Sequence, residues 1–266
     1  MALEVNKMRS MKWCLVIVTM IMAAGVANAS VLAFDDFSSG NESGGSGWAA
    51  EWTDHDGDPI TLNFSTADPL NENVSAQYLS QGDTMYALRE FATPLSASTI
   101  PELWSSIYLR PENLANGWMF GYEVRNGDEY GAICGLMYSE NNYIRLGDIH
   151  AGGRVGDGSE FVVDQETMLV MRFYKNDPGD TVWNRVDLYA DLDGTDGRYN
   201  NEVAIATGKD LGVYSPEELT HYRINQSGFL TDWDFVAVGT TKGDVIPEPI
   251  TIGLLGLGAL LMRRKR

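Results

Sequence analysis

The stretch Trp118-Met119-Phe120-Gly121-Tyr122-Glu123-Val124 carries a large apolar or aromatic residue at every second position. Side chains two residues apart lie on the same face of a β-strand, so this pattern predicts a strand with one buried face. The residues on that face are Trp118, Phe120, Tyr122 and Val124. The stretch Val186–Ala190 alternates in the same way and predicts a second such strand.

Short β segments separated by turn residues are predicted along the rest of the chain. They are Val31–Phe37, Thr61–Phe64, Met85–Phe91, Ser105–Arg110, Tyr130–Met137, Tyr143–Leu146, Thr167–Tyr174, Tyr222–Asn225 and Phe235–Gly239. Turns are expected at Asn126-Gly127, Asp177-Pro178-Gly179 and Asp193-Gly194, and a helical turn only at Pro216–Leu219. Many short strands without a long amphipathic helix predict an all-β fold, an antiparallel β-sandwich or jelly roll.

Residues 1–29 have the features of a secretory signal peptide. Lys7, Arg9 and Lys12 precede the apolar run Trp13–Ala24. Small residues follow at the expected cleavage positions, Ala27 and Ala29. We therefore expect export through the secretion machinery and cleavage by signal peptidase after Ala29.

A short hydrophobic segment stands at the other end, in residues 245–266. Ile250–Met262 would span roughly 20 Å as a helix, less than the ~30 Å of a hydrocarbon core. Pro247, Glu248 and Pro249 precede this segment and keep the backbone extended. The cations that follow it favour the cytoplasmic side of a membrane, and they are Arg263, Arg264, Lys265 and Arg266.

The order of these three parts resembles the PEP-CTERM sorting signal of Gram-negative bacteria. The resemblance implies a transient inner-membrane anchor, recognition by an exosortase and removal of the tail. It also implies delivery to the cell surface or to an extracellular polysaccharide matrix. The other interpretations of the segment are an ordinary C-terminal anchor and a buried hairpin.

Charge and cysteine content limit the partners and the chemistry. Removing three cations before Ala29 and four after Met262 leaves 12 Lys and Arg against 36 Asp and Glu in residues 30–262, a net charge of −24. Such a surface disfavours nucleic acid and anionic lipid. Cys134 is the only cysteine after residue 29, so an intramolecular disulfide is impossible there, and we expect a buried, inert thiol.

Two aromatic and acidic segments bracket the region from Ser30 to Gly243. The first is Phe34-Asp35-Asp36-Phe37, followed by the glycine-rich stretch Ser38–Gly47 and by Trp48 and Trp52. The second is Trp233–Thr241. This bracket resembles the concanavalin A-like lectin/glucanase superfamily, in its LamG-like group of exported bacterial proteins. The resemblance implies one domain over residues 30–243 whose first and last strands pair in one sheet.

The catalytic pattern of the glucanase branch, Glu-x-Asp-x-x-Glu, does not occur in this sequence. Glu51 with Asp54, and Asp128 with Glu129, approach it but lack its spacing. The three histidines lie at positions 55, 150 and 221, without the spacing of a zinc site. We therefore expect a protein that is not an enzyme, although carboxylates from separate strands could still meet.

Calcium and sugar are the two ligands that the residue types suggest. Asp191, Asp193 and Asp196 place three carboxylates on a predicted turn, where hard oxygen ligands would suit Ca²⁺, and a solvated acidic turn is the alternative. Asp54–Asp58 offers a weaker second candidate. Trp183, at the edge of a predicted loop, is the best candidate for an exposed sugar-binding aromatic. Trp48 and Trp52 are expected to anchor the glycine-rich loop.

The leading hypothesis is an exported, exosortase-processed β-sandwich that associates with polysaccharide at the cell surface or in the extracellular matrix without cleaving it. The first alternative is a polysaccharide hydrolase or lyase whose carboxylates come from separate strands. The second alternative is a purely structural component of the envelope. The fold hosts lectins, glycosidases, lyases and adhesion modules, so fold class alone does not separate these hypotheses.

Overall fold

The computed structural model describes residues 30–37, 39–54, 57–65, 78–81, 84–114, 119–127, 130–137, 142–148, 153–191, 204–228 and 231–246. The expected signal peptide and the sorting tail from Pro247 onward lie outside these ranges. Within them, no helix has the length and the apolar content needed to cross a membrane.

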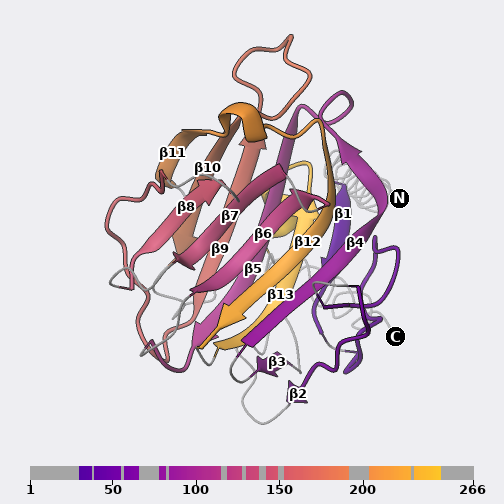
Figure 1. The fold of residues 1–266 in the computed structure, drawn as a ribbon, viewed down its shortest axis with the longest axis vertical. Coiled ribbons are helices and arrows are strands. Elements are labelled where there is room, and N and C mark those ends of the chain that lie inside the picture. Colours follow the sequence, from indigo (N-terminus) through magenta and orange to yellow (C-terminus); the bar gives the residue numbers. More distant parts are fainter. Residues whose placement is uncertain are drawn as a thin grey trace, which may run out of the picture. The chain divides into compact units, whose positions relative to one another are not determined.

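Two antiparallel sheets contain the strands of the described residues (Figure 1). The eight-stranded sheet consists of β1 (Val31–Asp35), β2 (Phe64–Ser65), β3 (Tyr78–Gln81), β5 (Glu102–Pro111), β9 (Thr167–Tyr174), β10 (Arg185–Asp191), β11 (Ala204–Asp210) and β13 (Thr231–Gly239). The five-stranded sheet runs in the order β4 (Thr84–Ser96), β12 (Glu218–Ser227), β6 (Met119–Asn126), β7 (Tyr130–Met137) and β8 (Ile144–Asp148). Figure 1 shows this smaller sheet in front of the larger one, which confirms the predicted β-sandwich.

The core lies between the two sheets and follows the alternation of the sequence. Phe120, Tyr122 and Val124 of β6 are at most 1% exposed and belong to the main apolar cluster, as predicted. Cys134 of β7 is also fully buried there, and burial raises the pKa of its thiol well above its ordinary value. Trp118 lies outside the described residues.

The pairing of the first strand with the last, which the superfamily resemblance implies, is present. β1 pairs antiparallel with β13, and Phe34 lies opposite Ala237. At the expected domain end, the short helix α2 (Lys242–Val245) packs on the outer face of the larger sheet. Val245 is fully buried in that contact, and its carbonyl accepts a hydrogen bond from Ser106 Oγ at 2.6 Å.

Two predicted strands, Tyr130–Met137 and Thr167–Tyr174, match the structure residue for residue. The helical turn expected at Pro216–Leu219 is wrong. The turn is the 3-10 helix η1 (Gly212–Tyr214), and β12 begins at Glu218, because Leu219 is buried and pairs with Leu95. Strands β3 and β11 were not expected from the sequence.

Tyrosine hydroxyls of the smaller sheet make hydrogen bonds to the backbone of the larger one. Tyr122 Oη donates to the Ser105 carbonyl at 2.9 Å and accepts the Met171 N–H at 3.0 Å. Ser105 and Met171 are register partners in β5 and β9, so the hydroxyl bonds both neighbouring strands at one position. Tyr222 Oη makes a single such bond, to the Ser106 carbonyl at 2.9 Å.

We predict that Tyr122→Phe lowers the free energy of unfolding by about 2–4 kcal/mol, because it removes the partner of a buried N–H and of a buried carbonyl. The matched variant Tyr222→Phe removes one partner and should cost about 1–2 kcal/mol. Urea denaturation of the two variants measures both values. Equal losses in the two variants would contradict the bridging role of Tyr122.

Candidate functional site

Trp183, the expected exposed sugar-binding aromatic, is buried, so that expectation is wrong. Its side chain is 0% exposed and lies in the main core cluster. Its Nε1 donates to the Ile100 carbonyl at 3.0 Å, and its backbone N–H donates to the Pro216 carbonyl at 3.1 Å. Trp183 therefore joins three distant segments of the chain inside the fold and offers no face to a ligand.

The two acidic loops that could bind calcium are only partly described. Asp191 ends β10 and is 9% exposed, whereas Asp193 and Asp196 lie outside the described residues. In the second loop, Asp54 Oδ1 accepts the Asp58 N–H at 2.9 Å, as in a turn. Among the described residues, no three carboxylate, histidine or cysteine side chains are placed to hold a metal ion. Calcium at Asp191, Asp193 and Asp196 stays a prediction.

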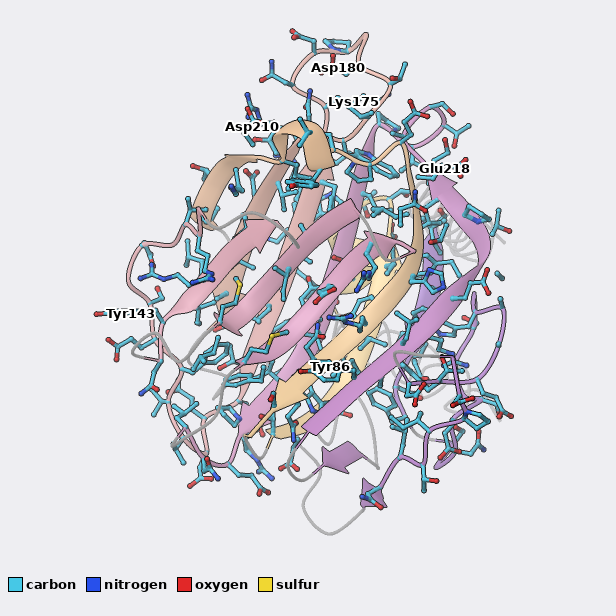
Figure 2. The ribbon with its side chains drawn as sticks, in the orientation of Figure 1. Tyr86, Tyr143, Lys175, Asp180, Asp210 and Glu218 are labelled. Atoms are coloured by element: carbon cyan, nitrogen blue, oxygen red, sulfur yellow. The ribbon has the colours of Figure 1, made fainter. Side chains whose placement is uncertain are left out.

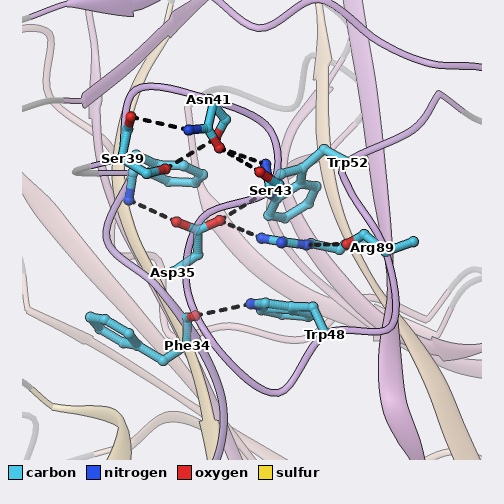
Figure 3. Close-up of polar contacts among 10 residues, drawn as sticks. Phe34, Asp35, Ser39, Asn41, Ser43, Trp48, Trp52 and Arg89 are labelled. Carbon is cyan, nitrogen blue, oxygen red and sulfur yellow. Dashed lines mark hydrogen bonds and ion pairs between the residues drawn. The ribbon is translucent and has the colours of Figure 1, made fainter.

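The first buried charge cluster lies where the glycine-rich loop crosses from β1 to β4 (Figure 3). Asp35 of β1 accepts hydrogen bonds at Oδ2 from Trp52 Nε1 at 3.0 Å and from Arg89 Nη1 at 2.5 Å. The guanidinium of Arg89 also lies 5.0 Å from the ring of Trp48 and donates from Nε to the Ala50 carbonyl at 2.9 Å. Trp48 and Trp52 thus anchor the loop, as predicted.

Burial dominates the electrostatics of this ion pair. The Asp35 and Arg89 side chains are 0% and 2% exposed. Burial raises the pKa of Asp35 and lowers the pKa of Arg89, each against the opposing effect of its partner. A hollow of about 250 Å³ lies beside Arg89, and its walls include the backbone that the pair holds in place. The cluster is therefore a structural link between the two sheets.

We predict that Arg89→Met lowers the free energy of unfolding by about 3–5 kcal/mol, because Asp35 remains buried without its cation. The control is Arg185→Met, which breaks the ion pair with the largely exposed Asp210 and should cost about 0–1 kcal/mol. Denaturant titration of both variants measures the difference. A loss for Arg89→Met no larger than that of the control would contradict this role.

A second acidic cluster brings together carboxyl groups from separate strands. Asp232 of β13 pairs with Arg110 of β5 at 3.0 Å, and Glu112 follows β5 directly. Burial first, and then the charge of Asp232, raises the pKa of Glu112. Asp232 is 0% exposed and bound to Arg110, so a polysaccharide chain has no access to it. This pair is a poor catalytic site.

The third cluster lies on the outer face of the five-stranded sheet, and we call it the Glu123 face. Since Tyr122 and Val124 point into the core, Glu123 and Arg125 point outward. Glu123 is nevertheless only 1% exposed. Its Oε1 accepts from Arg223 Nη2 at 2.8 Å and from Asn225 Nδ2 at 2.9 Å. Its Oε2 accepts from Arg125 Nη1 at 3.1 Å.

Apolar and aromatic side chains flank these charges on the same face. Met119, Ile133 and Met137 form a separate apolar cluster, against which the partly exposed Tyr86 packs (Tyr86 is labelled in Figure 2). The Arg223 guanidinium lies 5.4 Å from the Tyr86 ring centre. The Glu123 face therefore combines fixed hydrogen-bonding groups, an aromatic ring and flexible thioethers. Of these residues, only Tyr86 and Arg223 are partly exposed.

The sequence gives only a weak signal for this face. Alternation assigns Glu123 and Arg125 to solvent, and Arg223 and Asn225 lie about 100 residues further along the chain. The one local hint is that Met119, Ile133 and Met137 occupy outward positions of β6 and β7, where polar residues are expected.

The chain is a two-layered, all-β sandwich. On the outer face of its smaller sheet, charged, polar and apolar side chains gather around Glu123. No family model matches the sequence, and no curated protein matches it. Among solved structures, the chain is similar to domain 4 of AbnA, a GH43 extracellular arabinanase of Geobacillus stearothermophilus, in complex with arabinotriose. The identity is 12%, the TM-score is 0.49, and the match covers 82% of this chain and 98% of that domain.

Two further solved structures have a similar fold. One is the exoplasmic/lumenal domain of VIP36 in a Ca²⁺/Man3GlcNAc-bound form, with 11% identity, a TM-score of 0.42, and coverage of 76% of this chain and 92% of that one. The other is a Trypanosoma rangeli sialidase mutant, with 10% identity, a TM-score of 0.45, and coverage of 82% and 31%. Likeness at this level concerns the layered β arrangement alone.

Proposed function

We propose that this chain is an exported, exosortase-processed protein of the cell surface or extracellular matrix, whose β-sandwich binds polysaccharide on the Glu123 face without cleaving it. The observation that carries the binding part is the set of fixed polar groups around Glu123 beside the partly exposed Tyr86. Planar amide and guanidinium groups hydrogen-bond sugar hydroxyls, and a tyrosine ring packs against the C–H face of a pyranose. The export part rests on the signal peptide and the Pro-Glu-Pro tail.

The state of Glu123 favours binding over catalysis. A glycosidase needs one carboxyl group to act as acid and a second, ~5–10 Å away, as nucleophile or base. Both oxygens of Glu123 are already occupied by Arg125, Arg223 and Asn225. Glu123 is therefore a positioning group for its neighbours.

We predict that Tyr86→Ala weakens binding to the recognised polysaccharide at least 10-fold, since it removes the aromatic contact. The control Tyr189→Ala removes a tyrosine from the outer face of the larger sheet and should leave binding unchanged. Glycan arrays identify the ligand, and affinity electrophoresis compares the variants. Equal loss in both variants, or turnover of the polymer, would contradict a non-catalytic Glu123 face.

We predict that the mature protein recovered from the surface or matrix fraction begins at Ser30 and lacks Arg263–Arg266. Terminal peptide mapping by mass spectrometry checks both ends. Glu248→Ala should retain the tail, because it removes the charge between the two prolines, whereas the control Glu217→Ala should be processed normally. Recovery of the intact chain from the cytosol would refute the export proposal.

A further inference from the structure

The hollow of about 250 Å³ beside Arg89 is lined by polar groups that the ion pair with Asp35 leaves unused. Arg89 Nε donates to the Ala50 carbonyl, and Nη1 donates to Asp35. Within the described residues, Nη2 has no hydrogen-bond acceptor, although Arg89 is only 3% exposed. Nη2 is also not among the fully enclosed atoms that lack a partner, so it reaches the open space that Arg89 lines.

Two exposed side chains line the same hollow, and neither makes a hydrogen bond within the described part of the chain. They are the hydroxyl of Ser46 and the carboxylate of Glu51. Burial lowers the pKa of Arg89, and the charges of Asp35 and Glu51 oppose that shift, so Glu51 is close enough to act on the guanidinium. The hollow therefore presents a fixed donor, a hydroxyl and a charged acceptor to solvent.

The backbone around the hollow is held from both sides. Ser46 exchanges two hydrogen bonds with Phe34 of β1, at 2.8 and 2.9 Å, and Ala49 donates to the Glu90 carbonyl of β4 at 2.9 Å. Gly45 permits this close approach, because its φ is +78° and a Cβ there would lie 2.0 Å from the Phe34 carbonyl oxygen. The walls are thus fixed before a ligand arrives, which lowers the entropic cost of binding.

We infer that this hollow is a second saccharide-binding site, which takes a single neutral sugar residue through its hydroxyl groups. Arg89 Nη2 needs an acceptor, whereas Glu51 needs a donor. A sugar hydroxyl supplies both, while a carboxylate only accepts and an ammonium group only donates. The volume exceeds the ~30 Å³ share of a water molecule several-fold, so the hollow admits a group larger than solvent.

The hollow is separate from the Glu123 face. Arg89 lies on the inner side of β4 with the core residue Ala87, whereas Tyr86 lies on the outer side. Trp48 lines the hollow but offers no free ring face, because it stacks on Phe91 at 5.4 Å and lies against the Arg89 guanidinium. Binding here therefore depends on hydrogen bonds.

The test maps saccharide binding by NMR on the isotopically labelled mature protein. The probes are the methyl glycosides of glucose, mannose, galactose and arabinose at about 50 mM, together with glucuronate. We expect a neutral glycoside to shift the signals of residues 43–51 and to bind more tightly than glucuronate. Full O-methylation of the best ligand should abolish binding, because no hydroxyl then donates to Glu51.

Two exposed carboxylates give a matched pair of variants. Glu51→Ala removes the acceptor of the hollow and should weaken binding of the neutral ligand about 10-fold. Glu90→Ala removes the same charge from a side chain that does not line the hollow, so it should leave the affinity unchanged. Equal losses in the two variants, or an affinity that survives O-methylation, would overturn the inference.

The positions of the shifted signals separate this site from the proposed one. Shifts confined to Tyr86, Arg223 and their neighbours would overturn the inference and leave the Glu123 face standing. Shifts confined to residues 43–51 would support the inference and contradict binding on the Glu123 face. The absence of shifts with every neutral glycoside would overturn the inference, while polysaccharide binding on the Glu123 face is still tested by Tyr86→Ala.

Discussion

The buried ion pair between Asp35 and Arg89 joins the first strand of the larger sheet to the edge strand of the smaller one. Removing both charged groups from water costs free energy that the attraction between them only partly offsets. The pKa of Asp35 is raised because burial disfavours its charged form. Asp35 also fixes the position of the neighbouring chain, because it accepts hydrogen bonds from the backbone N–H of Phe37 and from Nε1 of Trp52. Phe37 and Trp52, at the two ends of the glycine-rich segment, are thereby both held against Asp35 of β1.

The same principle extends through the interior, where polar groups connect sheets that no disulfide joins. Tyr122 and Tyr222 stack at 5.1 Å and send their hydroxyls to adjacent residues of β5. Apolar packing alone tolerates sliding of one sheet over the other, whereas a buried hydroxyl is satisfied at one position only. The relative placement of the sheets therefore depends on a few hydrogen bonds as well as on the core.

Local patterns predicted most of the strands but not β3 and β11, and they did not predict which polar and aromatic side chains the fold buries. Alternation located β7 and β9 correctly because it depends on residues two apart. Trp183 was wrongly predicted to be exposed because its partners, the carbonyls of Ile100 and Pro216, are remote in sequence. Patterns of neighbouring residues cannot predict such contacts. The burial of Glu123 was not predicted for the same reason, because its partners Arg223 and Asn225 belong to the distant strand β12. Burial of a polar residue is a property of the assembled sheet.

The outer faces of the two sheets bury different kinds of side chain. On the larger sheet, Val245 and Ile246 pack on the apolar residues of β5, β9 and β13. On the smaller sheet, Glu123, Arg125 and Asn225 are buried, and Asn225 Oδ1 lacks a donor among the described residues. An unsatisfied buried acceptor costs about 1–3 kcal/mol. The outer face of the smaller sheet thus buries hydrogen-bonded charged groups, whereas the outer face of the larger sheet buries an apolar cluster.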